Sequence, residues 1–156
     1  MFKTVEISRT WSVHQNKIPD LNGIDYVEQS IICLSSSNDS LQITINKEAH
    51  RNDNKYYISI IDMNNNKLSY LVTEEDFEQS KELIQKVLHK KVFLIKSSVE
   101  PDKTIQLSIY KDLKLFVANY YATNNVTVQT LPLEEWFNQE IEDLSMSDLE
   151  LFNKLN

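Results

Sequence analysis

The residue types that form nucleophilic sites occur in this chain without the partners that would activate them. Ser8, Ser98 and Ser108 have no adjacent histidine and acid in a pattern typical of a hydrolase triad. Cys33, the only cysteine, lies in an apolar run, which predicts a buried strand position. A single cysteine also excludes an internal disulfide, and it fits a reducing compartment.

Metal-binding residues show no characteristic spacing either. The three histidines are His14, His50 and His89. His14 ends a predicted strand and His50 lies in a polar segment, 47–55, that we predict to be a loop. His89 follows a predicted helix, where the helix dipole favours a cation. Because their spacing does not match that of known metal sites, we expect structural roles for all three.

Glycine and arginine are scarce, and this scarcity excludes several functions. Gly23 is the only glycine among 156 residues, so the chain cannot form the glycine-rich loops that bind phosphate in Rossmann and P-loop proteins. Arg9 and Arg51 are the only arginines, and the formal net charge is −7. A protein that binds nucleic acid needs a basic surface to displace counterions, so we expect no nucleic-acid partner.

Short, neutral, hydrogen-bonding side chains alternate with apolar ones along several segments. They are Ser8, Thr10, Gln42, Thr44, Ser59, Gln106 and Ser108. This period of two predicts strands with one polar face. Two interpretations are open: the polar face is the solvated outside of a sheet, or it lines a polar lumen while the apolar face packs under helices.

Tyrosines form a second group of candidate ligand-binding residues. Tyr56, Tyr57, Tyr110, Tyr120 and Tyr121 could line a cavity by ring stacking and hydroxyl contacts. Packing within a sheet is the more common role of tyrosine in strands, and it is the alternative interpretation.

The elements that must position these side chains are mostly strands. The alternation predicts strands over 3–13, 41–45, 57–61, 68–72, 92–99, 104–110 and 113–122. One internal helix is predicted after Thr73, its N-cap, with an apolar face of Phe77, Leu83, Ile84, Val87 and Leu88. The set predicts an α+β fold, an antiparallel, closed or nearly closed eight-stranded β-barrel with helices packed outside.

Charge is concentrated at the C-terminal end. Residues 134–156 have a net charge of −6, which leaves the preceding residues nearly neutral. Large apolar residues are mixed with these acids, so we predict acidic amphipathic helices over about 133–154, with Ser145 or Ser147 as a cap. No linker composition divides the chain, and residues 1–156 are therefore predicted to form a single domain.

Four segments, in this order, resemble motifs of one superfamily. Glu6-Ile7-Ser8-Arg9-Thr10-Trp11 is similar to an opening strand written E-x-E-x-K, and Tyr57-Ile58-Ser59-Ile60-Ile61 to a strand written Y-L-T-I-K. The segment 72–88 is similar to the helix that follows, and 135–141 to a closing D-W-L-G-x-E-V motif. Together they resemble the CYTH superfamily, the triphosphate tunnel enzymes that include thiamine triphosphatases, inorganic tripolyphosphatases and class IV adenylyl cyclases.

The resemblance implies a tunnel in which carboxylates hold Mg²⁺ or Mn²⁺ while arginine and lysine bind triphosphate. In this chain most of those charged positions hold other residues. The acidic positions fall on Ser8, Lys67, Ser69, Leu71, Gln106, Ser108, Asn119 and Tyr121. The basic positions fall on Thr10, Gln42, Thr44, Ile61 and Ser98. Glu6 keeps the first acid and is the one metal-ligand candidate, and Lys96 stands at a basic position.

These replacements indicate a CYTH-like tunnel protein with a neutralised tunnel, a non-catalytic module that binds a small ligand or a protein partner. No metal or other cofactor is expected. The alternative is a divergent phosphohydrolase acting on triphosphate, polyphosphate or a nucleoside triphosphate with Mg²⁺ or Mn²⁺, using Glu6 with Lys67 or Lys96. A third interpretation is an unrelated small β-barrel. Because the sequence lacks an apolar span and a signal-peptide pattern, we expect no membrane association and a cytoplasmic location.

Overall fold

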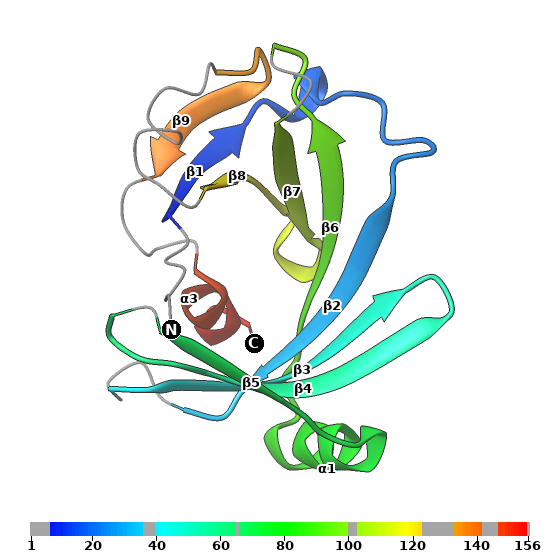
Figure 1. Cartoon of the computed structure of the whole chain (residues 1–156), viewed down its shortest axis with the longest axis vertical. Helices are drawn as coiled ribbons and strands as arrows, with labels where there is room; N and C mark the ends of the chain where they lie inside the picture. Colours follow the sequence, from blue (N-terminus) through cyan, green and yellow to red (C-terminus); the bar gives the residue numbers. More distant parts are fainter. Residues whose placement is uncertain are drawn as a thin grey trace.

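One antiparallel sheet organises the chain in the computed structural model (Figure 1). The described residues are 7–35, 40–64, 66–99, 103–122, 133–141 and 147–155; for 7, 8, 121 and 122 only the backbone is described. The strands are β1 (Ile7–Val13), β2 (Tyr26–Cys33), β3 (Gln42–His50), β4 (Asp53–Ile61), β5 (Lys67–Leu71), β6 (Leu88–Lys96), β7 (Thr104–Tyr110), β8 (Leu115–Ala122) and β9 (Phe137–Ile141). Their order is β5-β4-β3-β2-β6-β7-β8-β1-β9.

The sheet curls but its hydrogen bonds do not close it. For the predicted closed or nearly closed eight-stranded barrel, closure is not confirmed, and the strand number is corrected to nine, with β5 and β9 as the edges among the described residues. The α+β class and the antiparallel pairing are confirmed. The ninth strand arises because β9 pairs with the free side of β1.

Two helices lie on opposite faces of this sheet (Figure 1). Helix α1 (Glu74–Ile84) packs outside the curve, where Phe77 contacts the apolar residues of β2, β3 and β4. Helix α3 (Asp148–Asn153) lies within the curve, against β2 and β6. The prediction that the helices pack outside is therefore wrong for α3. Its three buried side chains, Leu149, Leu151 and Phe152, need apolar partners, which the inside of the curve supplies.

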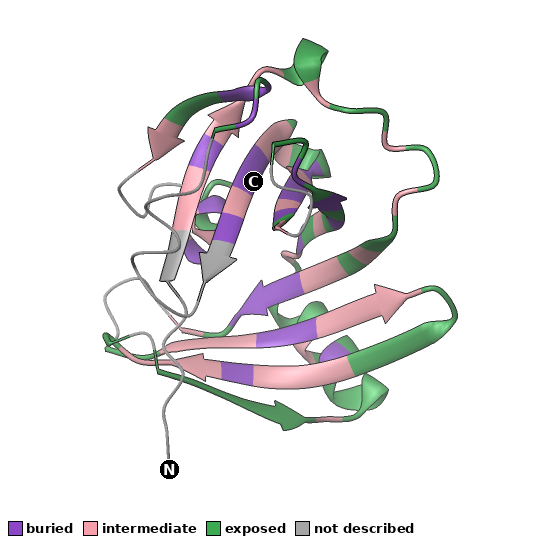
Figure 2. Cartoon of the chain, turned by 45° about the horizontal axis from the view of Figure 1, so that its top comes forward, coloured by how far each residue is buried: buried purple, intermediate pink, exposed green. Residues whose placement is uncertain are grey.

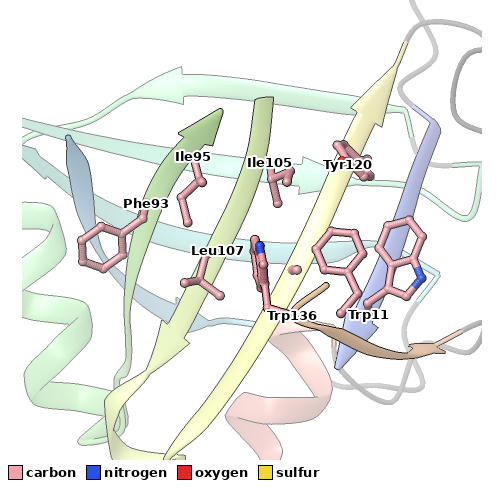
Figure 3. Packing of buried hydrophobic residues seen from close by; sticks show 9 residues of the cluster. Trp11, Phe93, Ile95, Ile105, Leu107, Tyr120 and Trp136 are labelled. Atoms are coloured by element: carbon pink, nitrogen blue, oxygen red, sulfur yellow. The ribbon is translucent and has the colours of Figure 1, made fainter. Parts of the chain in front are cut away.

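The two faces of the sheet have different compositions, and we name them by α3. The inner face is the one that α3 covers, and the outer face is the opposite one. On the outer face, β6, β7, β8 and β1 carry a core of large apolar residues (Figure 3). Trp11 is its centre: its ring stacks on Phe137 at 4.8 Å and meets Tyr120 edge-on at 5.6 Å between centroids. Figure 2 shows where the strands are buried; at the end of β2 three successive residues, Ile31, Ile32 and Cys33, are buried, because α3 covers one face there and α1 the other.

Helix α1 begins where the sequence predicts. The Thr73 hydroxyl accepts from the backbone N–H of Asp76, and the Asp76 carboxylate accepts from the backbone N–H of Thr73, which completes a capping box. The predicted apolar face is wrong beyond Phe77. Leu83 is 84% exposed, and Leu88 belongs to β6, where it is fully buried. The helix ends earlier because Gln85 adopts a left-handed conformation, with φ 55°.

The predicted C-terminal helices over 133–154 are also corrected. Residues Phe137–Ile141 form β9, not a helix, because their backbone pairs with β1 and Phe137 fills the outer core. Helix α3 is the helical part, and the Ser147 hydroxyl caps it by accepting from the backbone N–H of Glu150. Ser145 lies outside the described residues.

A bidentate ion pair fixes β9 to β1. Arg9 Nε donates to Glu140 Oε1 and its Nη2 donates to Oε2, both at 2.7 Å. The guanidinium also lies over the Trp11 ring, 4.9 Å from its centroid. Hydrogen bonding to Arg9 lowers the pKa of the Glu140 carboxyl from its usual value of 4.5. Arg9 is therefore a structural residue of the outer face.

We predict that Glu140→Gln lowers the free energy of unfolding by about 1 kcal/mol at neutral pH, because it removes a charge-assisted pair that is only partly exposed. A lowered pKa means that the stabilisation is complete above pH 4.5 and is lost as the pH falls through the lower folded-state pKa. Urea unfolding followed by tryptophan fluorescence measures the difference at neutral and acidic pH. Glu135→Gln, at an exposed position, is the control; an equal effect of both variants would contradict the prediction.

Candidate functional site

A row of small polar side chains crosses the inner face from β2 to β5. The pairing register aligns Cys33, Thr44, Ser59 and Ser69, so these four side chains share one face. Cys33 packs against α3, which identifies that face as the inner one. Ser59 Oγ and Ser69 Oγ lie 3.3 Å apart, and Asn46 Nδ2 donates to Thr44 Oγ1 at 2.9 Å. Neutral hydrogen bonds therefore connect this row.

A second polar row crosses the other half of the inner face. The register aligns Gln106 with Asn119 and Asn119 with Thr10. The Thr10 hydroxyl donates to Asn119 Oδ1 at 2.6 Å. Ser108, two residues along β7 from Gln106, is buried on the same face beside Val117. Both polar rows thus lie on the inner face, which also carries the apolar residues that pack against α3, while a separate core of large apolar residues occupies the outer face.

The remaining sequence candidates are distributed unevenly. Gln42, Ile61 and Lys67 form a further inner row. Lys96 ends β6 and is exposed. Ser98 lies beyond β6, where its backbone N–H and hydroxyl donate to the buried Glu134 carboxylate, so it belongs to a turn and not to the rows.

Three candidate residues lie wholly or partly outside the part of the chain that the structure describes. Glu6 lies outside the described residues, and the side chains of Ser8 and Tyr121 are not described. The backbones of Ser8 and Tyr121 pair with each other in the β1–β8 ladder.

The candidate tyrosines divide between the two faces. Tyr57 and Tyr110 are on the inner face, where Tyr57 contacts Glu48 and Tyr110 contacts α3. Tyr56 packs against Phe77 at 5.8 Å between ring centroids, and Tyr120 packs in the outer core. The cavity-lining interpretation therefore fits Tyr57, and the packing interpretation fits Tyr56, Tyr110 and Tyr120.

A groove of about 330 Å³ lies on the inner side of β4 and β5. Its lining includes Glu48, Lys55, Tyr57, Lys67, Ser69 and Leu71. The Tyr57 hydroxyl donates to Glu48 Oε2 at 3.3 Å, and burial, followed by the Glu48 charge, raises the pKa of Tyr57. Tyr57 is therefore a neutral hydrogen-bond donor in this groove.

Sequence reasoning missed Glu48 and Lys55 because it predicted a loop over 47–55. That prediction is wrong: β3 continues to His50 and β4 starts at Asp53, with a tight turn at Arg51 and Asn52. The turn places Arg51 at φ 57°, a conformation usually signalled by glycine, and no glycine is present.

An ion pair attaches α3 to the inner face. Lys90 Nζ donates to both oxygens of Asp148, at 3.2 and 3.1 Å, and the Tyr110 hydroxyl donates to Asp148 Oδ1 at 2.7 Å. The Lys90 side chain is only 13% exposed, so Asp148 neutralises a largely desolvated cation. The same helix covers Cys33, and burial raises the pKa of that thiol to about 12.

Neither arginine contributes to the inner face. Arg9 shares the outer face with Trp11 and Tyr120, as its pairing register and its contact with Glu140 require. Arg51 lies in the β3–β4 turn, where its side chain is 78% exposed and 4.0 Å from Asp25. The strongest phosphate-binding side chains of the chain are therefore placed away from the inner face.

The inner-face donors among the described residues do not fit a divalent metal ion. Mg²⁺ and Mn²⁺ prefer several carboxylate oxygens at one point. Among the described residues, no three of His, Cys, Asp and Glu form a group that could hold a metal. Glu48 is bound by Tyr57, and Asp148 is bound by Lys90 and Tyr110.

Known structures share this fold. Over 96% of this chain and 95% of the other, the structure is similar to the crystal structure of the inorganic triphosphatase NE1496, with a TM-score of 0.72 and 16% sequence identity. It is also similar to the PH1819 protein from Pyrococcus horikoshii OT3, with a TM-score of 0.58, 12% identity and coverage of 94% and 95%. The fold is thus shared with an inorganic triphosphatase, and at this level of identity the likeness shows the fold alone.

In the sequence comparisons, no family model and no curated protein matches the chain. Within the described part of the chain, no helix is long and apolar enough to span a membrane.

We predict that Asp148→Asn increases the rate at which a thiol reagent labels Cys33 by about tenfold. The variant lacks the charged carboxylate that accepts from Lys90, which weakens the docking of α3 by about 1–2 kcal/mol. A buried thiol reacts only when the helix that covers it moves away. The sequence contains no other cysteine, so the signal reports this position alone.

Glu150→Gln is the matched control for this labelling, since it removes a charge from the same turn of α3 but from a residue that forms no ion pair with Lys90. Equal labelling rates for the native protein and Asp148→Asn would contradict the assigned anchor.

Proposed function

We propose that this chain is a non-catalytic binding module built on the triphosphate tunnel fold. The observation that carries the proposal is the position of its two arginines. Arg9 is used on the outer face to bind Glu140, and Arg51 is exposed in a turn. Triphosphate transfer needs several cations around the reacting phosphate, to bind it and to stabilise the charge that develops.

The uncharged polar rows of the inner face support the same proposal. Its rows of hydroxyl and amide side chains hydrogen-bond to one another, for example Thr10 with Asn119. Such groups recognise neutral or weakly charged ligands, or peptide groups, by direct hydrogen bonds. Lys90 does not add a free positive charge, because Asp148 neutralises it. The described carboxylates do not form a metal site, so the proposal includes no metal-dependent reaction.

A divergent phosphohydrolase is the second candidate, and one comparison favours it. The structural neighbour NE1496 is named an inorganic triphosphatase. In this chain, Lys55 and Lys67 line the inner-face groove, and Lys96 is exposed at the end of β6. If these lysines bind a polyphosphate, Lys67→Ala and Lys96→Ala will each weaken binding and hydrolysis.

We predict that tripolyphosphate, ATP and thiamine triphosphate cause no Mn²⁺-dependent rise in melting temperature, and that no phosphate is released. A ligand present at one hundred times its dissociation constant stabilises a protein by about 2.7 kcal/mol. For a domain of this size, such binding would raise the melting temperature by about 5–10 °C. Differential scanning fluorimetry with and without Mn²⁺ measures the shift, and a phosphate assay measures turnover.

Each measurement has an internal comparison. A rise with Mn²⁺ alone separates metal binding from ligand binding, and Lys67→Ala separates binding in the groove from binding elsewhere. A metal-dependent shift accompanied by phosphate release that Lys67→Ala abolishes would refute the non-catalytic proposal and support the phosphohydrolase.

A further inference from the structure

Strand β5 combines a free backbone edge with the inner-face groove. It is the last strand of the sheet, and no described residue pairs with its outward side. All five of its residues are exposed, and Leu71 reaches 82% (Figure 2). Within the described part of the chain, the edge of β5 therefore has N–H and C=O groups without a strand partner, next to a groove.

The edge lacks most of the features that normally prevent strand addition. Exposed edges are usually protected by proline, by a bulge or by charges pointing into the sheet. The β4–β5 register runs without interruption from Lys67 to Leu71, and this segment contains no proline. Leu68 and Tyr70 are each more than half exposed on the outer side of the strand. Such an edge is suited to accept another extended chain.

The groove has Lys67 at one end, and an apolar contact beside two opposite charges at the other. Lys67 has no carboxylate within ion-pair distance among the described residues. At the other end, Leu71 pairs with Tyr57, and Lys55 lies opposite Glu48 on β3, so charges of both signs are close together there. Lys67 is therefore a cation available to a partner at the end of the groove away from Glu48, and Leu71 with Tyr57 is the apolar contact.

We propose that β5 binds an extended peptide segment of a partner protein as an added strand, with a carboxylate against Lys67 and an apolar side chain against Leu71 and Tyr57. The inference rests on the proposed function, because it names the partner class of the same inner-face groove. Backbone hydrogen bonds to β5 provide affinity, and the groove selects the side chains.

The spacing of the strand fixes the pattern of that peptide. Alternate side chains of an added strand lie about 7 Å apart on one face. Those on the inner face lie level with Lys67, Ser69 and Leu71, which requires an acid, a small polar residue and an apolar residue in turn. Those on the outer face lie level with Leu68 and Tyr70, which favours apolar residues.

A second copy of this chain fits the edge less well. Antiparallel self-pairing centred on Ser69 would place Lys67 opposite Leu71 of the other copy, so the lysine would again have no carboxylate. Each copy also has a net charge of −7, and the two would repel each other. An acidic–apolar peptide supplies the missing carboxylate.

Two fluorescent peptides test the proposal: one contains the sequence Glu-Val-Ser-Val-Leu and the other the reverse order, to allow both strand directions. Fluorescence anisotropy with the full chain measures binding, and amide hydrogen exchange locates it. We expect one peptide to bind and to slow exchange at Lys67–Leu71. Lys67→Glu should weaken binding at least tenfold, and a peptide with Lys in place of Glu should restore it.

Lys111→Glu is the matched control, because Lys111 is exposed at the end of β7, away from the groove, and the variant should bind like the native chain. Circular dichroism checks that both variants fold. Absence of binding by both peptides, or binding that Lys67→Glu leaves unchanged, overturns the inference. Dimerisation in sedimentation that protects β5 without peptide also overturns it, in favour of a second copy.

A phosphate-release assay on the same preparation distinguishes failure of the proposed function from failure of the β5 inference. Release of phosphate from tripolyphosphate refutes the proposed function whatever the peptides do. Failure of the peptides without phosphate release refutes the β5 inference alone.

Discussion

The pairing register of the strands decides which residues of this protein can meet a ligand. Side chains alternate between the two faces of a sheet, so a shift of one residue would exchange the faces of a whole strand. In β1 the register is fixed by Trp11, which is 2% exposed and packs against Phe137 and Tyr120. Since Arg9 is two residues from Trp11, the same contact holds Arg9 on the outer face and Thr10 on the inner one. A large aromatic core thus determines the charge of the opposite surface.

Local signals in the sequence predicted those features that neighbouring residues decide. The period of two indicated most strands, and Thr73 with Asp76 indicated the start of α1, because capping involves residues three apart. Features that depend on distant partners were not predictable in this way. Phe137–Ile141 has the composition of an amphipathic helix, yet it forms a strand because β1, more than a hundred residues earlier, offers a free edge and an aromatic core.

In the candidate site, too, some features follow from neighbouring residues and others depend on distant partners. The polar row through Thr44, Ser59 and Ser69 follows from alternation, whereas the groove needs the long β3–β4 hairpin that brings Glu48 beside Lys55. That hairpin turns at Arg51 without a glycine, so the usual signal was absent. The position of α3 was not predictable for another reason. A helix of six residues with three buried apolar side chains could pack on either face of the sheet, and the ion pair between Asp148 and Lys90 identifies the inner face.

The neutral inner face and the inward position of α3 depend on each other. Leu149, Leu151 and Phe152 remove water from the part of the inner face that they cover. A desolvated arginine or carboxylate there would lose several kcal/mol of hydration energy unless a partner compensated it. Hydroxyl and amide groups can satisfy one another without charge, as Thr10 and Asn119 do. Lys90 is a largely desolvated cation of this face, and α3 itself brings Asp148 to neutralise it. An uncompensated charge would therefore be costly in the part of the inner face that α3 covers, and the groove along β4 and β5, which α3 is not seen to line, keeps Glu48, Lys55 and Lys67.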